Sequence, residues 1–247
     1  MNPVTPRLGE IWVYLSASPL LGLTLTLLAY QAAFWLHKRC NGHPAANPVL
    51  LSVLALVAIL WATGTPYATY FEGAQFVHFL LGPATVALAI PLYAQFARLK
   101  RLALPLLATL VAGSITAALS AVAVAAAFGA STVTQMSLAP KSVTTPIAMG
   151  IAERIGGLPS LTAVLVISTG ILGAIGARYV YRLLAVKDEA VRGFALGIAS
   201  HGIGTARAFQ ESEEAGAFAA LAMGLNGLAT ALLVPVLVPV LLPLLPA

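Results

Sequence analysis

Charged residues are scarce in this chain of 247 residues: only 9% are charged, whereas 60% are hydrophobic. Soluble globular domains have about a quarter of their residues charged, so we expect an integral membrane protein without a soluble domain. The sequence also lacks the basic face with interleaved aromatic side chains that is typical of nucleic-acid binding, and we expect no nucleic-acid partner. The single cysteine, Cys40, has no partner for an internal disulfide, so nothing points to an oxidising compartment.

The patterns of common catalytic and metal sites are missing as well. The sequence has no Ser-His-Asp arrangement, no His, Cys and carboxylate spacing suited to a metal ion, and no phosphate-binding glycine loop. We therefore predict that the protein is not an enzyme and that it uses no cofactor and no metal.

Long apolar runs fill most of the chain. Because a crossing helix needs about 20 mostly apolar residues, the length has room for about seven or eight membrane segments. The predicted fold is an all-α, polytopic membrane protein with helices that are broken by Pro or Gly or that re-enter the membrane. We expect a single transmembrane domain, with N-terminal helices at 1–70, repeat-like units at 71–135 and 136–190, and a broken helix plus the last helix at 191–247.

Basic residues gather in three places, near positions 38, 100 and 180. Short basic loops lie on the cytoplasmic side of a membrane, so we expect the N-terminus to be outside. The first apolar run is too long for the core of a signal peptide, and we interpret it as a retained helix.

A short internal match suggests a structural repeat. Residues 81–86 (LGPATV) align with 138–143 (LAPKSV) at an offset of 57, and Gly113 aligns with Gly170 at the same offset. Paired, Pro-interrupted segments in two halves of a chain are typical of secondary transporters. The match makes Thr85 a candidate for substrate binding, although so short a match also arises by chance.

A polar segment at 138–157 interrupts the apolar pattern. A helix can begin at Pro140, and the free N–H groups of its first turn would attract a carboxylate. Pro146 argues against a plain helix, and we favour a re-entrant hairpin. Alternatively, the hydroxyl groups bond to their own helix and the lysine extends to the membrane surface. The candidate substrate-binding residues here are Lys141, Ser142, Thr144 and Thr145.

A second polar segment follows at 200–207, and hydrocarbon would reject several of its side chains. Its glycines allow close approach of a helix or ligand, Arg207 could clamp a carboxylate, and His201 could bind substrate or carry a proton. The alternatives are that Arg207 pairs with the acidic run at 211–214 and that His201 is a packing contact. The candidates here are His201, Gly202, Gly204, Thr205 and Arg207.

Two further polar residues complete the set of candidates. Asn226 either binds substrate or joins two helices by hydrogen bonds. Glu153 is, together with His201, a candidate for proton coupling. Its alternative role is an ion pair at the mouth of the hairpin.

The motifs KSVTTPIAM at 141–149, SHGIGTAR at 200–207 and MGLNG at 223–227 together resemble the LrgB/CidB family over roughly residues 75–240. The resemblance implies a bacterial inner-membrane protein that affects murein hydrolase activity and autolysis, usually paired with a small holin-like LrgA/CidA protein. The family is also similar to the plant plastid glycolate/glycerate translocator. Because this chain shows neither a fused LrgA-like part nor a transit peptide, we expect the separate bacterial form.

Our leading hypothesis is a secondary carrier for small monocarboxylates of the glycolate, glycerate, pyruvate or lactate kind, possessing a carboxylate site at a half-helix and coupled to protons. The alternative is a holin-like pore component or modulator of autolysis without a substrate site. The expected partners are the small carboxylate, membrane lipid, an LrgA/CidA-like protein and further copies of this chain.

Overall fold

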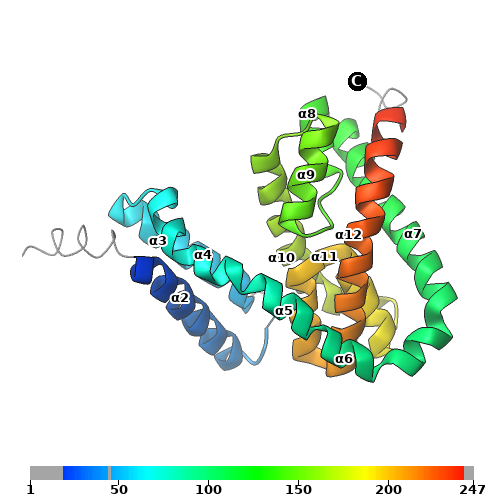
Figure 1. Cartoon of the computed structure of the whole chain (residues 1–247), viewed down its shortest axis with the longest axis horizontal. Coiled ribbons are helices and arrows are strands. Elements are labelled where there is room, and N and C mark those ends of the chain that lie inside the picture. Colours follow the sequence, from blue (N-terminus) through cyan, green and yellow to red (C-terminus); the bar gives the residue numbers. More distant parts are fainter. Residues whose placement is uncertain (1–18, 44–45, 242–247) are drawn as a thin grey trace, which may run out of the picture. The chain divides into compact units, whose positions relative to one another are not determined.

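A computed structural model describes residues 19–43 and 46–241, and within these ranges every regular element is a helix (Figure 1). The chain divides into two compact units, Met1–Ala87 and Leu88–Ala247. Four of the described helices are long and apolar enough to cross a membrane: Leu20–Arg39, Phe96–Ala127, Pro159–Leu183 and Glu213–Val238. The all-α membrane fold is thereby confirmed, whereas the expected seven or eight segments are not.

The first unit contains α2 (Pro19–Arg39), α3 (Pro48–Thr63), α4 (Tyr67–Phe79) and α5 (Leu81–Ala87). The helix α4 approaches α2 at Gly22, where a Cβ would meet the Tyr70 carbonyl oxygen and lie 3.2 Å from the Ala74 nitrogen. Beside this contact, the hydroxyl groups of Thr26 and Tyr70 lie 2.7 Å apart. Close approach of the backbones at a glycine and one hydrogen bond between hydroxyl groups thus hold the two helices together, as is common in membrane proteins.

The second unit contains three crossing helices and three shorter elements. The crossing helices are α7 (Phe96–Ala127), α10 (Pro159–Leu183) and α12 (Glu213–Leu241), and the shorter elements are α6 (Ala89–Ala94), α8 (Thr132–Leu138) and α9 (Thr145–Ile155). The remaining element is α11 (Glu189–Glu211). With 32 residues, α7 is about 48 Å long, so its ends extend beyond a hydrocarbon core of about 30 Å.

The element α11 is a hairpin rather than a rod. His201 has φ 43° and ψ −134°, outside the helical region. Arg192 Nη2 lies 2.6 Å from Glu211 Oε2, and the Ser212 hydroxyl donates to Glu189 Oε2 at 2.5 Å. Such pairs form only when the two arms run antiparallel from a bend near residue 201. Each arm rises about 15–18 Å, half the thickness of the hydrocarbon core, so neither arm is long enough to cross it.

The segment 138–157 also turns back on itself. The backbone N–H of Leu158 donates to Ser137 Oγ at 2.8 Å, and the Thr162 hydroxyl donates to the Ser137 carbonyl oxygen at 3.0 Å. Residues 139–144 carry no helix, and α9 returns the chain to its starting level. Both ends of the segment therefore meet, as the re-entrant hairpin predicted from the sequence requires.

The two hairpins pack at opposite ends of α7 and α12 (Figure 1). In the first half of each of these helices, Leu110 and Phe218 form a buried cluster with Phe194 and Ile198 of α11, and Leu99 and Leu102 of α7 pack against it. Near their last residues, Val122 and Val234 lie in a different cluster, which contains Val143, Ala148 and Ile151 of the 138–157 hairpin. The hairpins therefore enter the helix bundle from opposite sides.

The predicted repeat is not confirmed by these elements. Residues 81–86 fall in the short helix α5 of the first unit, whereas residues 139–143 form turns of the second unit. The two matching segments, LGPATV and LAPKSV, thus adopt different backbone conformations. A proline allows both, because its fixed φ angle fits the first turn of a helix as well as an isolated turn.

Cysteine labelling from the two membrane faces will test the hairpin. In a Cys40→Ser background, cysteines replacing the exposed residues Lys187 and Glu213, one on each side of α11, are expected to react with an impermeant maleimide from the same face. A cysteine at the exposed Phe128, at the far end of α7, should react from the opposite face. Labelling of positions 187 and 213 from different faces would show that α11 crosses the membrane.

Candidate functional site

Asn226 of α12 joins the two hairpins at a buried point, with only 1% of its surface exposed. Its Nδ2 donates to the carbonyl oxygens of Ser142 and Ile198, both at 3.1 Å. Because carbonyl oxygens only accept, they determine which way the amide faces. Its Oδ1 accepts from the Ser114 hydroxyl of α7 at 2.5 Å. One side chain thus connects the tips of both hairpins to two crossing helices.

The N-terminus of α9, which follows Ser142 and so lies beside Asn226, has an excess of positive charge. Thr144 occupies the N-cap position, but its side chain makes no capping hydrogen bond. Pro146 has no N–H, and the remaining N–H groups of the first turn carry the positive end of the helix dipole. Lys141 Nζ donates to Ser142 Oγ at 3.2 Å and has no ion pair among the described residues. The combination suits an anion.

His201 occupies the tip of the α11 hairpin and is 4% exposed. Its Nε2 lies 3.0 Å from the Val166 carbonyl oxygen of α10 and therefore carries the proton of this hydrogen bond. Gly170 makes room for the ring, because a Cβ there would lie 2.8 Å from it. The Thr205 hydroxyl donates to the His201 carbonyl oxygen at 2.8 Å.

Ser200, next to His201, is fully buried, and its hydroxyl has no hydrogen-bond partner in the described part of the chain. The hydroxyl faces Gly173 of α10, where a Cβ would meet it. An unpaired buried hydroxyl costs about 1–3 kcal/mol, so the hairpin tip holds a polar group whose hydrogen-bonding capacity is unused.

Three more of the predicted residues, Gly202, Gly204 and Thr145, belong to the hairpins themselves. Gly204 allows the two α11 arms to touch, because a Cβ there would lie 2.7 Å from the Leu196 carbonyl oxygen. Gly202 has more room, with Met223 Sδ 3.8 Å from the position of a Cβ. Thr145 begins α9 and is half-buried. Of the two glycines, only Gly204 is therefore required for close packing of the hairpin.

Two candidates, Arg207 and Glu153, make no hydrogen bond to Asn226, and the structure does not place the third, Thr85, relative to it. Arg207 Nη2 lies 3.5 Å from Glu211 Oε1, and Nη1 donates to Gln210 at 3.2 Å, so its charge is used toward the base of the hairpin. Glu153 is exposed near the last turn of α9. Thr85 belongs to α5 of the first unit, and its side chain lies outside the described part of the structure.

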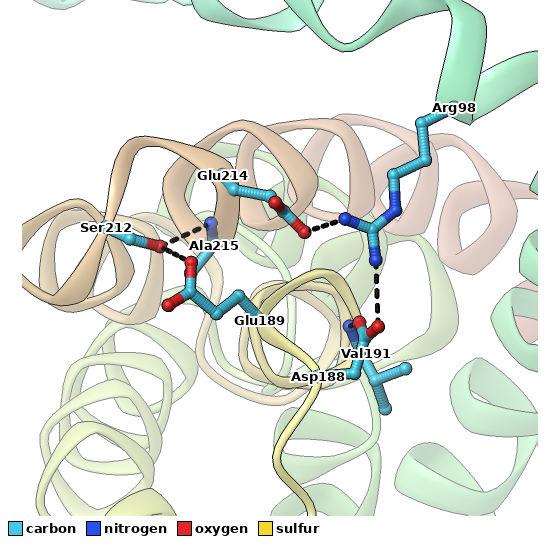
Figure 2. Close-up of polar contacts among 7 residues, drawn as sticks. All are labelled: Arg98, Asp188, Glu189, Val191, Ser212, Glu214 and Ala215. Carbon is cyan, nitrogen blue, oxygen red and sulfur yellow. Dashed lines mark hydrogen bonds and ion pairs between the residues drawn. The ribbon is translucent and has the colours of Figure 1, made fainter.

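Ion pairs close the base of the α11 hairpin (Figure 2). Arg98 of α7 bonds to Asp188, at 2.8 Å, and to Glu214 of α12. Asp188 also caps α11 by accepting from Val191 N at 3.0 Å. Because these groups are partly exposed, each pair contributes only about 0–1 kcal/mol. Their effect is to align the first residues of three helices at one end of the unit.

Sequence reasoning missed Ser114, Ser200 and these ion pairs. Ser114 is one of two serines in the apolar run of α7, and its hydroxyl was the available signal, since a hydroxyl within a crossing helix often bonds to a neighbouring helix. No comparable signal pairs Arg98 with two acids 90 and 116 residues away. Among the described residues, no group of three or more His, Cys, Asp or Glu is placed to hold a metal ion.

Membrane-length helices, two hairpins and a buried amide between them define a multi-pass membrane protein with a polar centre. The chain belongs to the LrgB-like family, whose sequence profile matches residues 26–240, and the resemblance noted in the sequence is confirmed.

Two curated relatives illustrate the family. The chain is 37% identical over 216 residues to the uncharacterized protein YwbG of Bacillus subtilis strain 168, covering 87% of this chain and 96% of that protein. It is 32% identical over 220 residues to the antiholin-like protein LrgB of Bacillus cereus strain B4264, covering 89% of this chain and 95% of the relative. No solved structure matches the chain.

Proposed function

We propose that this chain is an antiholin-like protein of the bacterial inner membrane that modulates murein hydrolase activity and autolysis, acting with a small LrgA/CidA-like protein. The observation that carries the proposal is the 32% identity, over 89% of the chain, to relatives named antiholin-like protein LrgB. These names favour this role over the carrier that we expected from the sequence, and they do not describe an enzyme. The basic residues around the starts of α7 and α11 support a cytoplasmic location of that end.

Complementation will test this role. In a bacterial strain whose own LrgB-type gene is deleted, expression of this chain with the strain's LrgA-like protein should slow lysis by detergent and lower murein hydrolase activity in the medium. The matched control is the same strain carrying the empty vector. Equal lysis rates at equal membrane levels of the protein would contradict the proposal.

One observation favours a second candidate, the secondary transport of small monocarboxylates such as glycolate, glycerate, pyruvate or lactate. Lys141 is half-buried without a carboxylate partner among the described residues, beside the uncapped first turn of α9. A cation in such a place is costly and marks ion or substrate pathways in membrane proteins. The positive ends of half-helices bind substrate carboxylates in transporters.

In this second candidate, Lys141 and the α9 first turn with Thr144 and Thr145 bind the carboxylate, while Asn226 holds the two hairpin tips together. The centre is closed in this structure, since Ser142 and His201 are 6% and 4% exposed. Transport therefore requires the hairpin tips to separate. His201 at the tip of the α11 hairpin and the exposed Glu153 of α9 remain the candidates for proton coupling.

Uptake of labelled pyruvate and glycolate into proteoliposomes separates the two functions. If the chain is a carrier, Lys141→Gln should lower uptake about tenfold or more, because a charge-assisted hydrogen bond contributes about 1.5–3 kcal/mol. Lys187→Gln removes an exposed lysine of the α10–α11 loop and should leave uptake unchanged. An absence of wild-type uptake, with and without a pH gradient, would eliminate the carrier and leave the antiholin-like role standing.

A further inference from the structure

A groove of about 570 Å³ opens on the second unit between the first turns of α7 and α11. Its walls are apolar on both sides, with Ala97 and Leu102 on α7 and Val191 on α11. Its polar groups include Arg98, Arg101 and Asp188. A cavity with apolar walls and two guanidinium groups suits a ligand that is anionic at one end and hydrocarbon at the other.

The two arginines of the groove differ in their bonding. Arg98 is already paired with Asp188 and Glu214 (Figure 2), and Asp188 also accepts from the backbone of Val191. Arg101 is exposed and has no ion pair or hydrogen bond among the described residues. The acids near the groove are thus neutralised, and one guanidinium remains to bind a ligand. Its planar fork of donors matches a phosphate group.

The groove opens where aromatic and basic side chains mark the membrane surface. Tyr93 and Phe96 are 80% and 49% exposed, and their rings stack with centroids 6.3 Å apart. Lys100 Nζ lies 4.6 Å from the centroid of the Phe96 ring. Exposed aromatic rings next to basic residues at the start of a crossing helix are typical of the lipid headgroup level. A ligand in this groove therefore meets lipid rather than bulk water alone.

We propose that this groove binds the headgroup of an anionic phospholipid. The phosphodiester bonds to Arg101, and the glycerol and first acyl carbons pack against Ala97, Leu102 and Val191. Basic pockets between membrane helices are suited to such headgroups. Because Asp188 both borders the groove and begins α11, the bound lipid braces the base of the hairpin. This site is independent of the polar centre and of either function proposed above.

The test uses the purified full-length chain after removal of lipid in mild detergent. Its melting temperature is measured with added phosphatidylglycerol, phosphatidylcholine or inorganic phosphate, and bound lipid is counted by native mass spectrometry. Phosphatidylglycerol should raise the melting temperature and remain bound, whereas the zwitterionic lipid and phosphate should do so far less. Arg101→Gln should weaken binding of phosphatidylglycerol about tenfold, the loss expected for one charge-assisted contact.

Two further variants make the test specific. Arg182→Gln removes an exposed arginine from the last turn of α10, outside the groove, and should bind the lipid like the wild type. Ala97→Phe fills the groove while keeping every charge and should no longer bind the lipid. If Arg101→Gln fails to fold, this variant alone tests whether the lipid binds in the groove.

Three results would overturn the proposal. An equal effect of inorganic phosphate would show a site for free anions. Equal binding of phosphatidylcholine would show that only the apolar wall of the groove binds lipid and that Arg101 does not select an anionic headgroup. Equal losses in Arg101→Gln and Arg182→Gln would show a diffuse attraction of the basic surface for acidic lipid.

Discussion

Asn226→Leu is expected to unfold at a markedly lower temperature than the wild-type chain. The substitution keeps the approximate size of the side chain but removes the donors to the carbonyl oxygens of Ser142 and Ile198 and the acceptor for Ser114. Each of the two carbonyl oxygens loses this donor at a cost of about 1–3 kcal/mol, so the combined loss is about 2 kcal/mol or more. The Ser114 hydroxyl still has the Leu110 carbonyl oxygen as its acceptor. Since both hairpin tips depend on this amide, they should come apart together.

The melting temperature in detergent and the protease sensitivity of the two hairpins will measure this effect. The matched control is Thr230→Val, one turn further along α12. The Thr230 hydroxyl is buried but lies 3.4 Å from Asn226 Oδ1, too far for a strong hydrogen bond. Its loss should shift the melting temperature little. Equal stability of Asn226→Leu and the wild type would mean that the amide does not hold the hairpins.

The second large effect is expected for Gly197→Ala in the first arm of α11. A Cβ at this position would meet the Ala219 carbonyl oxygen of α12 and lie 2.8 Å from Ala222 Cβ. Neither the backbone nor a methyl group can rotate away, so the hairpin must move off α12. Overpacking of this kind costs about 1–3 kcal/mol, which exceeds the gain of up to about 1 kcal/mol that alanine brings to a helix.

Gly176→Ala on α10 is the control, because a Cβ there would meet no atom within 4 Å. That variant should be as stable as the wild type or more stable, while Gly197→Ala should melt at a lower temperature and expose its hairpin to protease. If the two alanine variants behave alike, α11 does not pack closely against α12.

The sequence located both polar segments but not the local structure of either one. In the 138–157 hairpin the sequence predicted a helix start at Pro140, whereas α9 begins at Thr145 and has Pro146 in its first turn. Only the presence of a break in the helix near these prolines followed from local chemistry. The role of Arg207 did not, because an arginine in a polar segment has two possible partners, a substrate or an acid. The structure directs it to Glu211, a choice that depends on how far residue 207 lies from the hairpin tip.

The membrane class was determined by the sequence alone, because apolar content is a sum over residues and does not depend on their arrangement. The same holds for the positions where polar residues interrupt the helices. Only the tertiary structure decided that 191–211 returns to its starting side and that two segments, 84 and 28 residues away from Asn226, meet at its amide. Such contacts are set by packing between distant segments, as at Gly197 against Ala219, and no local pattern specifies the partner of a buried hydrogen-bonding group.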